Sequence, residues 1–519
     1  MPSKFILTKI LATVGPACAD VGTLARLIDE GVRCFRINFS HGSFDDFEAA
    51  LTNIRKASKQ VQVPAGVLGD LSGPKIRVLP VRETVIELAV GDSVALVESG
   101  AETHRDEATG QVIVPTTFPP LVREVDPGHR VLINDGAIRM LATERVTVDG
   151  EARLICRVTQ PGALTSKKGV NLPDSDISAP SLTAYDHRCV DWAIERGLDY
   201  IALSFVRCAE DVKLLNEYMR SKGRDNRAMR SHTRLPVIAK IETPQAVRDL
   251  EGVVRESEGV MVARGDLGVE MDLAEVPVVQ KRIIEMAHDH GKPVIVATQM
   301  LESMIHASSP TRAEVSDAAN AVLDGADALM LSGETAVGRH PTQAVAVLAK
   351  VARVTEQYEA PRRRGETRPP RLPQATRYRT AALAHGVSTV VKDLQARFVV
   401  TWSELGGGAR YLSQNRMTMP IVAISSNEAA LRQMCLMFGV VPVLMARPAS
   451  SELFIHQMDQ LLLGNGWAEQ GDPVVLVMGE PLGTPGVTNE LRIHYVGDVC
   501  RLTWHAKENQ PQMNTDKHG

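Results

Sequence analysis

The sequence predicts an α/β protein built on a (β/α)8 TIM barrel, with a small β-barrel lid domain inserted into it and an α/β domain after it. Short apolar runs alternate with helical patterns in eight strand–helix units, the count of such a barrel. One stretch that interrupts this alternation is too long for a loop. Charged or hydroxyl residues recur where the apolar runs end. An open doubly wound sheet would show the same alternation, so the rhythm favours the barrel without excluding that alternative.

Length and composition limit the class of protein. A chain of 519 residues exceeds one hydrophobic core and indicates two to four domains. The 44% apolar and 23% charged residues are typical of a soluble globular protein, and the net charge of −4 argues against nucleic acid as a partner. No apolar run approaches the roughly 18–20 residues of a membrane span. Seven scattered cysteines without a CxxC pair indicate reduced thiols, so we expect a cytoplasmic protein.

The eight predicted barrel strands can be read in chain order. They are Ile10–Val14, Cys34–Phe39, Pro64–Leu71, Tyr200–Phe205, Val237–Ile241, Val260–Val262, Val294–Ala297 and Ala328–Leu331. The helices between and after them are Val21–Glu30, Ser43–Ser58, Thr183–Gly197, Glu210–Met219, a short helix after Pro244, Val276–His290, Thr311–Leu323 and Pro341–Tyr358. Thr183 is a suitable N-cap, and Gly31, Gly291 and Gly325 stand where helices end.

The long interruption, 78–173, reads as the inserted domain. Its segments alternate and are separated by turns such as Asp149-Gly150; they are Val85–Leu88, Ser93–Val97, Val112–Val114, Arg130–Ile133, Arg145–Val148 and Arg153–Thr159. The barrel then comprises 1–77 and 174–358. An insertion at this point overhangs the C-terminal face of the barrel, where such barrels keep their active sites, so we expect a lid.

The last domain is predicted over 359–505, followed by a polar tail over 506–519. Its strands are Arg397–Thr401, Pro420–Ile424, Val440–Leu444, Pro473–Met478 and Arg492–Val496. An Arg- and Pro-rich segment, 361–373, precedes them. We interpret this segment as a solvated linker, because the chain as a whole is acidic; contact with nucleic acid is the alternative.

The strand Val237–Ile241 and the residue after it carry two charges that need an explanation. Lys240 and Glu242 lie two residues apart, so both side chains point to the same side of an otherwise apolar strand. Burying these charges without partners would be very costly. We therefore expect a function for them at this strand end.

Similar groups follow the other strands. They are Arg36, Asn38, Ser40 and His41 after strand two; Asp70, Lys75 and Arg77 after strand three; Ala263, Arg264, Gly265 and Asp266 after strand six; Thr298 and Glu302 after strand seven; and Ser332 and Glu334 after strand eight. Taken singly, Arg264 and Asp266 could form an ordinary salt bridge, and Asn38 and His41 could be turn residues. Their recurrence at one end of six strands indicates an active site.

The residue types favour phosphoryl transfer. Magnesium typically takes one or two carboxylates and binds substrate phosphate, a role that suits Glu242 and Asp266. Lys240 and Arg36 supply positive charge for a moving phosphoryl group, which needs positioning and charge neutralisation more than covalent chemistry. Gly265 could let a backbone N–H approach an anion closely. The sequence contains no Walker loop, nucleophile elbow or zinc spacing.

From about residue 4 to residue 505, the chain resembles the pyruvate kinase family. The matching stretches, in family order, are KILATVGP at 9–16, RINFSHG at 36–42, KGVNLP at 168–173, IAKIE at 238–242, MVARGDLG at 261–268, ATQMLES at 297–303, PTRAEVSD at 310–317 and LSGET at 331–335. The resemblance implies a glycolytic enzyme that transfers the phosphoryl group of phosphoenolpyruvate to ADP, giving pyruvate and ATP. It also implies a homotetramer that requires Mg²⁺ or Mn²⁺.

The resemblance further implies a role for each matched residue. Lys240 would neutralise the moving phosphoryl group, Glu242 and Asp266 would hold the divalent cation, and Arg36 and Arg77 would place the phosphate. The backbone of Ala263, Arg264, Gly265 and Asp266, with the Thr298 hydroxyl, would seat the substrate carboxylate. Ser332 and Glu334 would belong, with Thr298, to a water relay that protonates the enolate. The nucleotide would contact Asn38, His41, Arg77, Asp135 and Lys168.

Two departures from the commoner family pattern predict differences in ligands. Asn38, Ser40, Asp70 and Leu71 match the site of a monovalent cation. The stretch DLSGPKIRV at 70–78, however, has Lys75 where most members have glutamate, as in members that do not need potassium. We expect the Lys75 ammonium to replace potassium; the alternative is that Lys75 points to solvent and Asp70 still binds the ion. Two unit charges about 4 Å apart interact by about 4 kcal/mol at an effective dielectric constant near 20.

The second departure lies in the C-terminal domain. Allosteric members carry a loop rich in Ser and Thr that binds phosphate, whereas this chain has TWSELGGGAR at 401–410. Its glycines could form an anion-binding nest, but hydroxyls are missing and Glu404 adds a repelling charge. We expect no activation by fructose 1,6-bisphosphate, and leave other sugar phosphates or AMP as effectors.

Two rival functions remain open on the sequence. A mutase- or aldolase-type barrel enzyme acting on phosphoenolpyruvate would share the metal carboxylates, but would not need Lys240 beside a nucleotide-covering lid. A regulator without activity would be expected to have lost Lys240, Glu242, Asp266 or Thr298, and all four are present.

Overall fold

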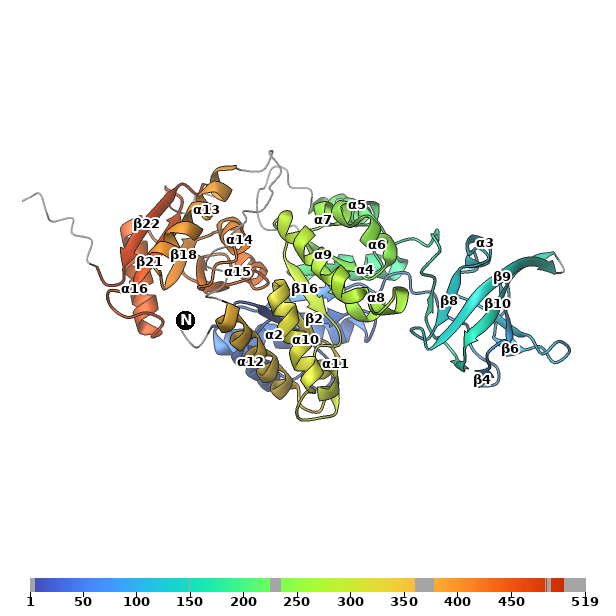
Figure 1. Cartoon of the computed structure of the whole chain (residues 1–519). Coiled ribbons are helices and arrows are strands. Elements are labelled where there is room, and N and C mark those ends of the chain that lie inside the picture. The colour runs from blue at the N-terminus through green and yellow to red at the C-terminus, as the bar shows by residue number, and fades with distance from the viewer. Residues whose placement is uncertain are drawn as a thin grey trace, which may run out of the picture.

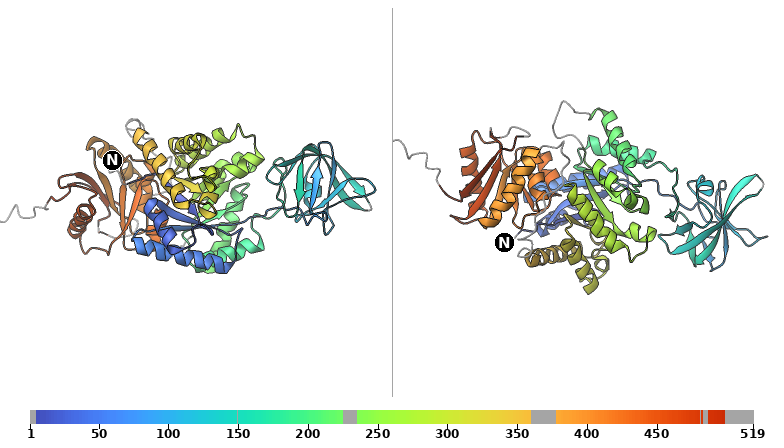
Figure 2. Two further views of the ribbon diagram at one scale, coloured as in Figure 1. Left: turned by 90° about the horizontal axis from the view of Figure 1, so that it is seen from below. Right: turned by 45° about the horizontal axis from the view of Figure 1, so that its top comes forward.

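The fold is described from a computed structural model that covers residues 5–148, 150–224, 235–359, 378–480, 482 and 487–498. The predicted linker 361–373 and the tail 506–519 lie outside these residues. The chain forms three bodies in a row (Figures 1 and 2): a barrel in the middle, the inserted domain beyond one end of it, and the C-terminal domain against the other end. In the part of the chain that the structure describes, no helix combines the length and apolar character needed to cross a membrane.

The central body is a closed ring of eight parallel strands, in the order β1-β17-β16-β15-β14-β13-β3-β2, which confirms the barrel over the open sheet. The strands are β1 (Lys9–Thr13), β2 (Val32–Asn38), β3 (Gly66–Asp70), β13 (Tyr200–Leu203), β14 (Val237–Ile241), β15 (Gly259–Ala263), β16 (Val294–Ala297) and β17 (Ala328–Leu331). Nearly every strand residue is buried, because helices cover the outside of the ring and side chains fill its interior.

Eight of the described helices around the barrel follow the predicted ranges within a few residues. They are α1 (Val21–Glu30), α2 (Phe44–Val61), α4 (Ala184–Glu195), α5 (Ala209–Met219), α6 (Pro244–Arg248), α9 (Val276–Asp289), α10 (Arg312–Asp324) and α12 (Pro341–Glu359). Two more, η1 (Arg220–Arg224) and α7 (Leu250–Glu256), were not predicted. Thr183 caps α4 as predicted, and Gly325 ends α10 in the left-handed conformation at φ 104°. Three short turns of helix after the last strands were not predicted: α8 (Arg264–Glu270), η2 (Glu302–Ile305) and α11 (Gly333–Ala336).

The inserted domain surrounds its own apolar core with two sheets, where the sequence predicts a small β-barrel. One sheet has seven strands in the order β12-β8-β9-β10-β5-β7-β6, and the other pairs β11 with β4. The elements are β4 (Val85–Leu88), β5 (Ser93–Val97), β6 (His104–Arg105), β7 (Val112–Pro115), α3 (Leu121–Glu124), β8 (Arg130–Ile133), β9 (Ile138–Val148), β10 (Glu151–Gln160), β11 (Gly162–Thr165) and β12 (Val170–Asn171). Strand β9 is longer than predicted.

The C-terminal domain is a five-stranded sheet in the order β20-β19-β18-β21-β22, with an apolar core on each face. Its elements are α13 (Tyr378–Asp393), β18 (Phe398–Trp402), α14 (Gly407–Gln414), β19 (Ile421–Ser425), α15 (Glu428–Met434), β20 (Val440–Leu444), α16 (Ser451–Gly464), β21 (Pro473–Met478) and β22 (Glu490–Tyr495). Ion pairs join it to loops that precede barrel strands: Arg416 to Asp327 at 2.6 Å and Arg432 to Asp199 at 2.9 Å. It therefore covers the N-terminal end of the barrel. The inserted domain, called the lid from here on, lies beyond the C-terminal end.

Candidate active site

The predicted charged residues converge at the C-terminal end of the barrel around Lys240. Its Nζ atom lies 3.2 Å from Glu242 Oε2 and 3.6 Å from Asp70 Oδ1. Arg36, from the neighbouring strand β2, approaches the other oxygen of Asp70 at 2.6 Å. The prediction that Lys240 and Glu242 emerge on one side of β14 is confirmed by their contact. Three strands, β2, β3 and β14, thus supply two cations and two carboxylates to one cluster.

Electrostatics keep Lys240 and Asp70 charged although both are buried. Burial disfavours the ammonium form of Lys240, but the carboxylates of Asp70, Glu242 and Asp266 outweigh burial and raise its pKa above the ordinary value. The same attraction acts on Asp70, where burial would raise the pKa but Lys240 and Arg36 lower it. Lys240 is therefore a permanent cation, whose side chain is 12% exposed.

The residues predicted for a monovalent cation are arranged around Asp70. Asn38 Oδ1 accepts a hydrogen bond from the Ser40 backbone at 3.1 Å, and Ser40 Oγ lies 3.1 Å from Ser72 Oγ. Leu71 is buried and its N–H bonds to the Ala202 carbonyl. Because Asp70 already faces Arg36 and Lys240, side chains of the protein balance its charge.

Strand β15 leads into α8, which brings three predicted residues beside Thr298. The Gly265 N–H donates to Thr298 Oγ1 at 2.7 Å, and a Cβ atom at Gly265 would lie in van der Waals contact with the Thr298 side chain. Thr298 itself adopts a left-handed backbone conformation at φ 67°, uncommon for a β-branched residue and typical of functional sites. Ala263 ends β15, and Asp266 lies in the first turn of α8.

Arg264 has a partner that the sequence did not indicate. Its Nη1 atom contacts both oxygens of Asp317, at 2.9 and 2.7 Å, and its Nη2 donates to the Thr298 carbonyl at 2.7 Å. The predicted alternative of an Arg264–Asp266 salt bridge is therefore replaced by a pair with a helix 53 residues further along the chain. This arginine fixes the loop that carries Thr298.

Glu334 uses both of its oxygens to hold backbone. Oε1 accepts from the Leu301 N–H at 3.0 Å, and Oε2 accepts from the Ser332 N–H at 2.7 Å. The carboxylate is 3% exposed, and the two bonds join the loops that follow β16 and β17. This geometry supports a positioning role for Glu334.

The remaining predicted residues lie toward the lid. Arg77 donates to the Lys167 carbonyl at 2.9 Å, and Lys75 Nζ lies 3.9 Å from Asp135 Oδ1. The carbonyl of Lys168 accepts from the Val78 N–H at 2.9 Å. His41 is exposed after β2. Within the described ranges, no hydrogen bond or ion pair joins Lys240 to the side chains of these five predicted residues, Arg77, Lys75, Asp135, Lys168 and His41.

Comparison with known proteins places this chain in a family. Models described as "Pyruvate kinase, barrel domain" and "Pyruvate kinase, alpha/beta domain" match residues 6–345 and 381–494. The pyruvate kinase of Corynebacterium glutamicum is 38% identical over 495 residues, which cover 95% of this chain and 98% of the relative. The chain belongs to the pyruvate kinase family.

Other relatives agree along the whole length. The pyruvate kinase of Mycobacterium tuberculosis is 38% identical over 490 residues, 94% of this chain and 98% of the relative. A crystal structure of a pyruvate kinase from Cryptosporidium parvum superposes with a TM-score of 0.85 at 31% identity, covering 95% of this chain and 96% of the other. As a member of the pyruvate kinase family, the protein is a phosphotransferase.

Pyruvate kinases generally use Mg²⁺, and the side chains at the predicted metal position fit that ion. Glu242 is 1% exposed, and its Oε2 atom accepts no hydrogen bond from the described residues. Burial raises the pKa of Glu242, Lys240 lowers it, and the nearby charge of Asp266 raises it again. Within the described ranges no cluster of three or more His, Cys, Asp or Glu side chains could hold a metal. Magnesium typically binds one or two carboxylates and completes its coordination with water and substrate oxygens, so Glu242 and Asp266 suit this ion.

Two residues that support the pyruvate kinase site were missed in the sequence. Lys240 Nζ donates to Ser204 Oγ at 2.7 Å, and the Phe205 N–H donates to Glu242 Oε1 at 2.6 Å. Phe205 adopts φ 54°, which points its N–H at the carboxylate. The sequence position of Ser204 and Phe205 could have indicated them, because they follow β13 directly, as the predicted polar groups follow the other strands.

Proposed function

We propose that the protein transfers the phosphoryl group of phosphoenolpyruvate to ADP, forming ATP and pyruvate. The observation that carries this proposal is the buried, permanently charged Lys240 beside Glu242 and Asp70 at the mouth of the barrel. A phosphoryl group in transfer spreads negative charge over its oxygens, and a fixed cation in a site shielded from water stabilises that charge strongly.

Each group in the cluster has a role in this proposal. Lys240 and Arg36 face the phosphoryl group, and Asp70 orients both cations. The first N–H groups of α8 and the Thr298 hydroxyl receive the substrate carboxylate, because N–H groups at a helix start attract anions. The Gly265 N–H, which donates to Thr298 Oγ1, would exchange that acceptor for the substrate. After transfer, the enolate takes a proton at its methylene carbon from water held near Thr298 and Ser332. Arg77, Asp135, Lys168, Asn38 and His41 meet the nucleotide when the lid closes.

Glu242 and Asp266 would hold Mg²⁺ or Mn²⁺, which neutralises the substrate carboxylate and the developing enolate oxygen. The Phe205 N–H fixes Oε1 of Glu242, whereas Oε2 accepts no hydrogen bond from the described residues and lies 3.2 Å from Lys240 Nζ. The ion would therefore share Oε2 with the Lys240 ammonium, which contributes a second positive charge.

A coupled assay for pyruvate tests the reaction. We expect pyruvate formation that requires phosphoenolpyruvate, ADP and a divalent cation together. Conversion of phosphoenolpyruvate without ADP would favour a mutase- or aldolase-type enzyme, and the absence of conversion with a panel of nucleoside diphosphates would contradict the proposal.

We also propose that Lys75 makes potassium unnecessary. Asp70 already faces Arg36 and Lys240, so its charge does not call for a bound ion. Lys75 lies on the connection from barrel to lid, with its Cε atom close to Gly169 and its ammonium near Asp135. Lid closure would carry this ammonium toward the nucleotide phosphates.

Replacing Lys75 with glutamate is expected to create a potassium requirement. In buffer with tetramethylammonium as the monovalent cation, the unchanged enzyme should keep its turnover, whereas Lys75→Glu should lose at least about tenfold, or 1.4 kcal/mol. Potassium should restore the variant. Activation of the unchanged enzyme by potassium of about tenfold or more would contradict the proposal.

The C-terminal domain is proposed not to respond to fructose 1,6-bisphosphate. Glu404, in the loop after β18, holds the Ser426 hydroxyl at 2.6 Å and places a negative charge in the loop. Hydroxyls of Thr401, Ser403 and Thr488 lie near Gly408. A sugar monophosphate or AMP is the alternative effector. Calorimetric titration with fructose 1,6-bisphosphate should show no micromolar binding; a micromolar Kd would overturn this expectation.

A further inference from the structure

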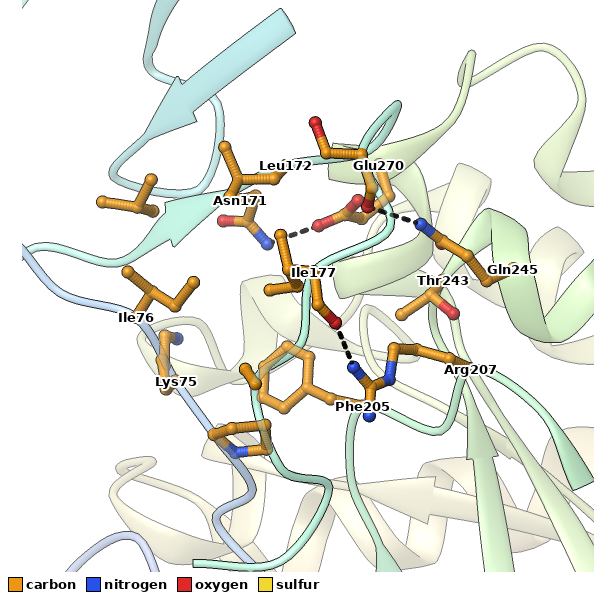
Figure 3. Close-up of a pocket in the computed structure, with 14 residues that line it drawn as sticks. Lys75, Ile76, Asn171, Leu172, Ile177, Phe205, Arg207, Thr243, Gln245 and Glu270 are labelled. Carbon is orange, nitrogen blue, oxygen red and sulfur yellow. Dashed lines mark hydrogen bonds between the residues drawn. The ribbon is translucent and has the colours of Figure 1, made fainter. Parts of the chain in front are cut away.

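Helix α8 connects the candidate metal site with the lid. Its first turn carries Asp266, and its last residue is Glu270, about one helical turn further along. Asn171 Nδ2 donates to Glu270 Oε1 at 2.7 Å (Figure 3). Asn171 is the last residue of β12, which pairs with β8 in the large sheet of the lid. One hydrogen bond thus joins the catalytic helix to the lid sheet.

A second residue of α8 also lies close to the lid. The turn after β8 contains Gly136, at φ 80°, and a Cβ atom there would lie 3.5 Å from Val269 of α8. The last two residues of α8 therefore both face the lid. Since the helix rises about 1.5 Å per residue, Glu270 and Asp266 are only about 6 Å apart along its axis. A shift imposed on one end of so short a helix reaches the other.

The chain that returns from the lid to the barrel, residues 171–179, is called the return segment here. It lines a cavity of about 70 Å³ between lid and barrel, together with Lys75 and Phe205. Besides Glu270, two barrel side chains hold it: Gln245 Nε2 donates to the Ser175 carbonyl at 3.2 Å, and Arg207 Nη1 donates to the Ile177 carbonyl at 2.7 Å (Figure 3). Only Glu270, of these three, belongs to the helix that carries Asp266.

Burying the Glu270 carboxylate is costly in free energy compared with the one hydrogen bond that it accepts from Asn171. The residue is 7% exposed, and no ion pair within the described ranges involves it. Burial raises its pKa to about 7, Asn171 lowers it, the charge of Asp266 raises it, and the charge of Arg130 lowers it. The Oδ1 atom of Asn171 is also buried and has no hydrogen-bond partner among the described residues. A buried carboxylate that has one neutral donor and no ion pair in the described residues is costly to the fold, which points to a use in function.

We propose that Glu270 is a positioning residue that couples the lid to the metal carboxylate: through Asn171 it fixes α8, and with it Asp266, relative to the lid sheet. The inference rests on the assignment of Asp266 to the metal proposed above. Movement of the lid then changes the position of Asp266, and occupation of the metal position restrains the lid.

Removing the coupling should weaken metal binding while the fold persists. Groups that orient metal ligands typically contribute 10- to 100-fold to affinity or activity. We expect Glu270→Ala to raise the Kd for Mn²⁺, followed by the free-ion electron paramagnetic resonance signal, by about tenfold or more. Asn171→Ala should raise the Kd by a similar factor. The double variant should be no weaker than either single one, because both changes break the same contact.

Two matched variants separate coupling from general loosening. Glu270→Gln keeps an acceptor for Asn171 Nδ2 and adds a donor for the unpartnered Oδ1, so it should bind Mn²⁺ like the unchanged enzyme. Gln245→Ala removes a hydrogen bond to the same return segment but leaves α8 untouched, so its Kd should also be unchanged. Thermal unfolding of all variants identifies any that fail to fold, in which case Asn171→Ala carries the test.

Each outcome has a distinct meaning. An unchanged Kd in both Glu270→Ala and Asn171→Ala overturns the coupling, and so does a loss in Gln245→Ala as large as that in Glu270→Ala. Asp266→Asn, titrated beside them, tests the metal assignment itself. If Asp266→Asn binds Mn²⁺ normally, the proposed metal site is wrong; if it loses binding while the Glu270 and Asn171 variants do not, only the coupling is wrong.

Discussion

Lys240→Met is expected to lower kcat by about 10³-fold or more, the range observed when a single charge-neutralising group is removed from a phosphoryl-transfer or oxyanion site. Methionine has nearly the length of lysine but no charge. The ammonium lies in a pocket formed with Asp70, Glu242 and Ser204, where water cannot readily substitute for it. The loss should appear in kcat, because the charge acts on the group in transfer.

The fold should survive this substitution. Asp70 keeps its bond to Arg36, and Glu242, whose pKa is already raised by burial, can take up a proton in place of the lost cation. The matched control is Lys213→Met on α5, where the lysine is half-exposed and paired with Glu210 at the surface. Such surface pairs contribute little, so the control should keep full activity. Lys240→Met with more than about a tenth of the normal kcat would contradict the assignment, since one charge-neutralising group is expected to contribute at least 10²-fold.

The barrel was predictable because its signals are local. Each strand is a short apolar run, and glycines such as Gly325 mark helix ends by their backbone freedom alone. The contact between Lys240 and Glu242 was also predictable, since strand geometry puts residues i and i+2 on one side. These are properties of neighbours in the sequence.

The contacts that orient the site were not predictable in this way. Arg264 could be matched with several acidic residues, and only the closed barrel selects Asp317. The relay role of Glu334 stays a prediction, and the sequence did not indicate that the surrounding loops bring two backbone N–H groups to its oxygens. The short helices α8 and α11 follow strands without the length that makes a helical pattern readable. The sequence alone does not indicate which group each of these side chains contacts.

Glu242→Gln is the second substitution with a large expected effect, and it separates activity from stability. Glutamine keeps an oxygen for the Phe205 N–H but removes the negative charge from the proposed metal position. We expect turnover at moderate Mg²⁺ to fall by about 10²-fold, with the half-activating concentration of Mg²⁺ raised by a similar factor, because a direct ligand contributes at least as much as the groups that orient it.

The stability of the same variant should change little, or increase. In the metal-free protein, Glu242 is a buried carboxylate close to a second carboxylate, Asp266, and the raised pKa reports the cost of that arrangement. Glutamine removes the repulsion, while Lys240 retains Asp70 as a partner. We therefore expect the free energy of unfolding without metal to stay within about 1 kcal/mol of the unchanged enzyme. A loss of activity explained by a comparable loss of stability would show that Glu242 holds the fold and does not hold the metal.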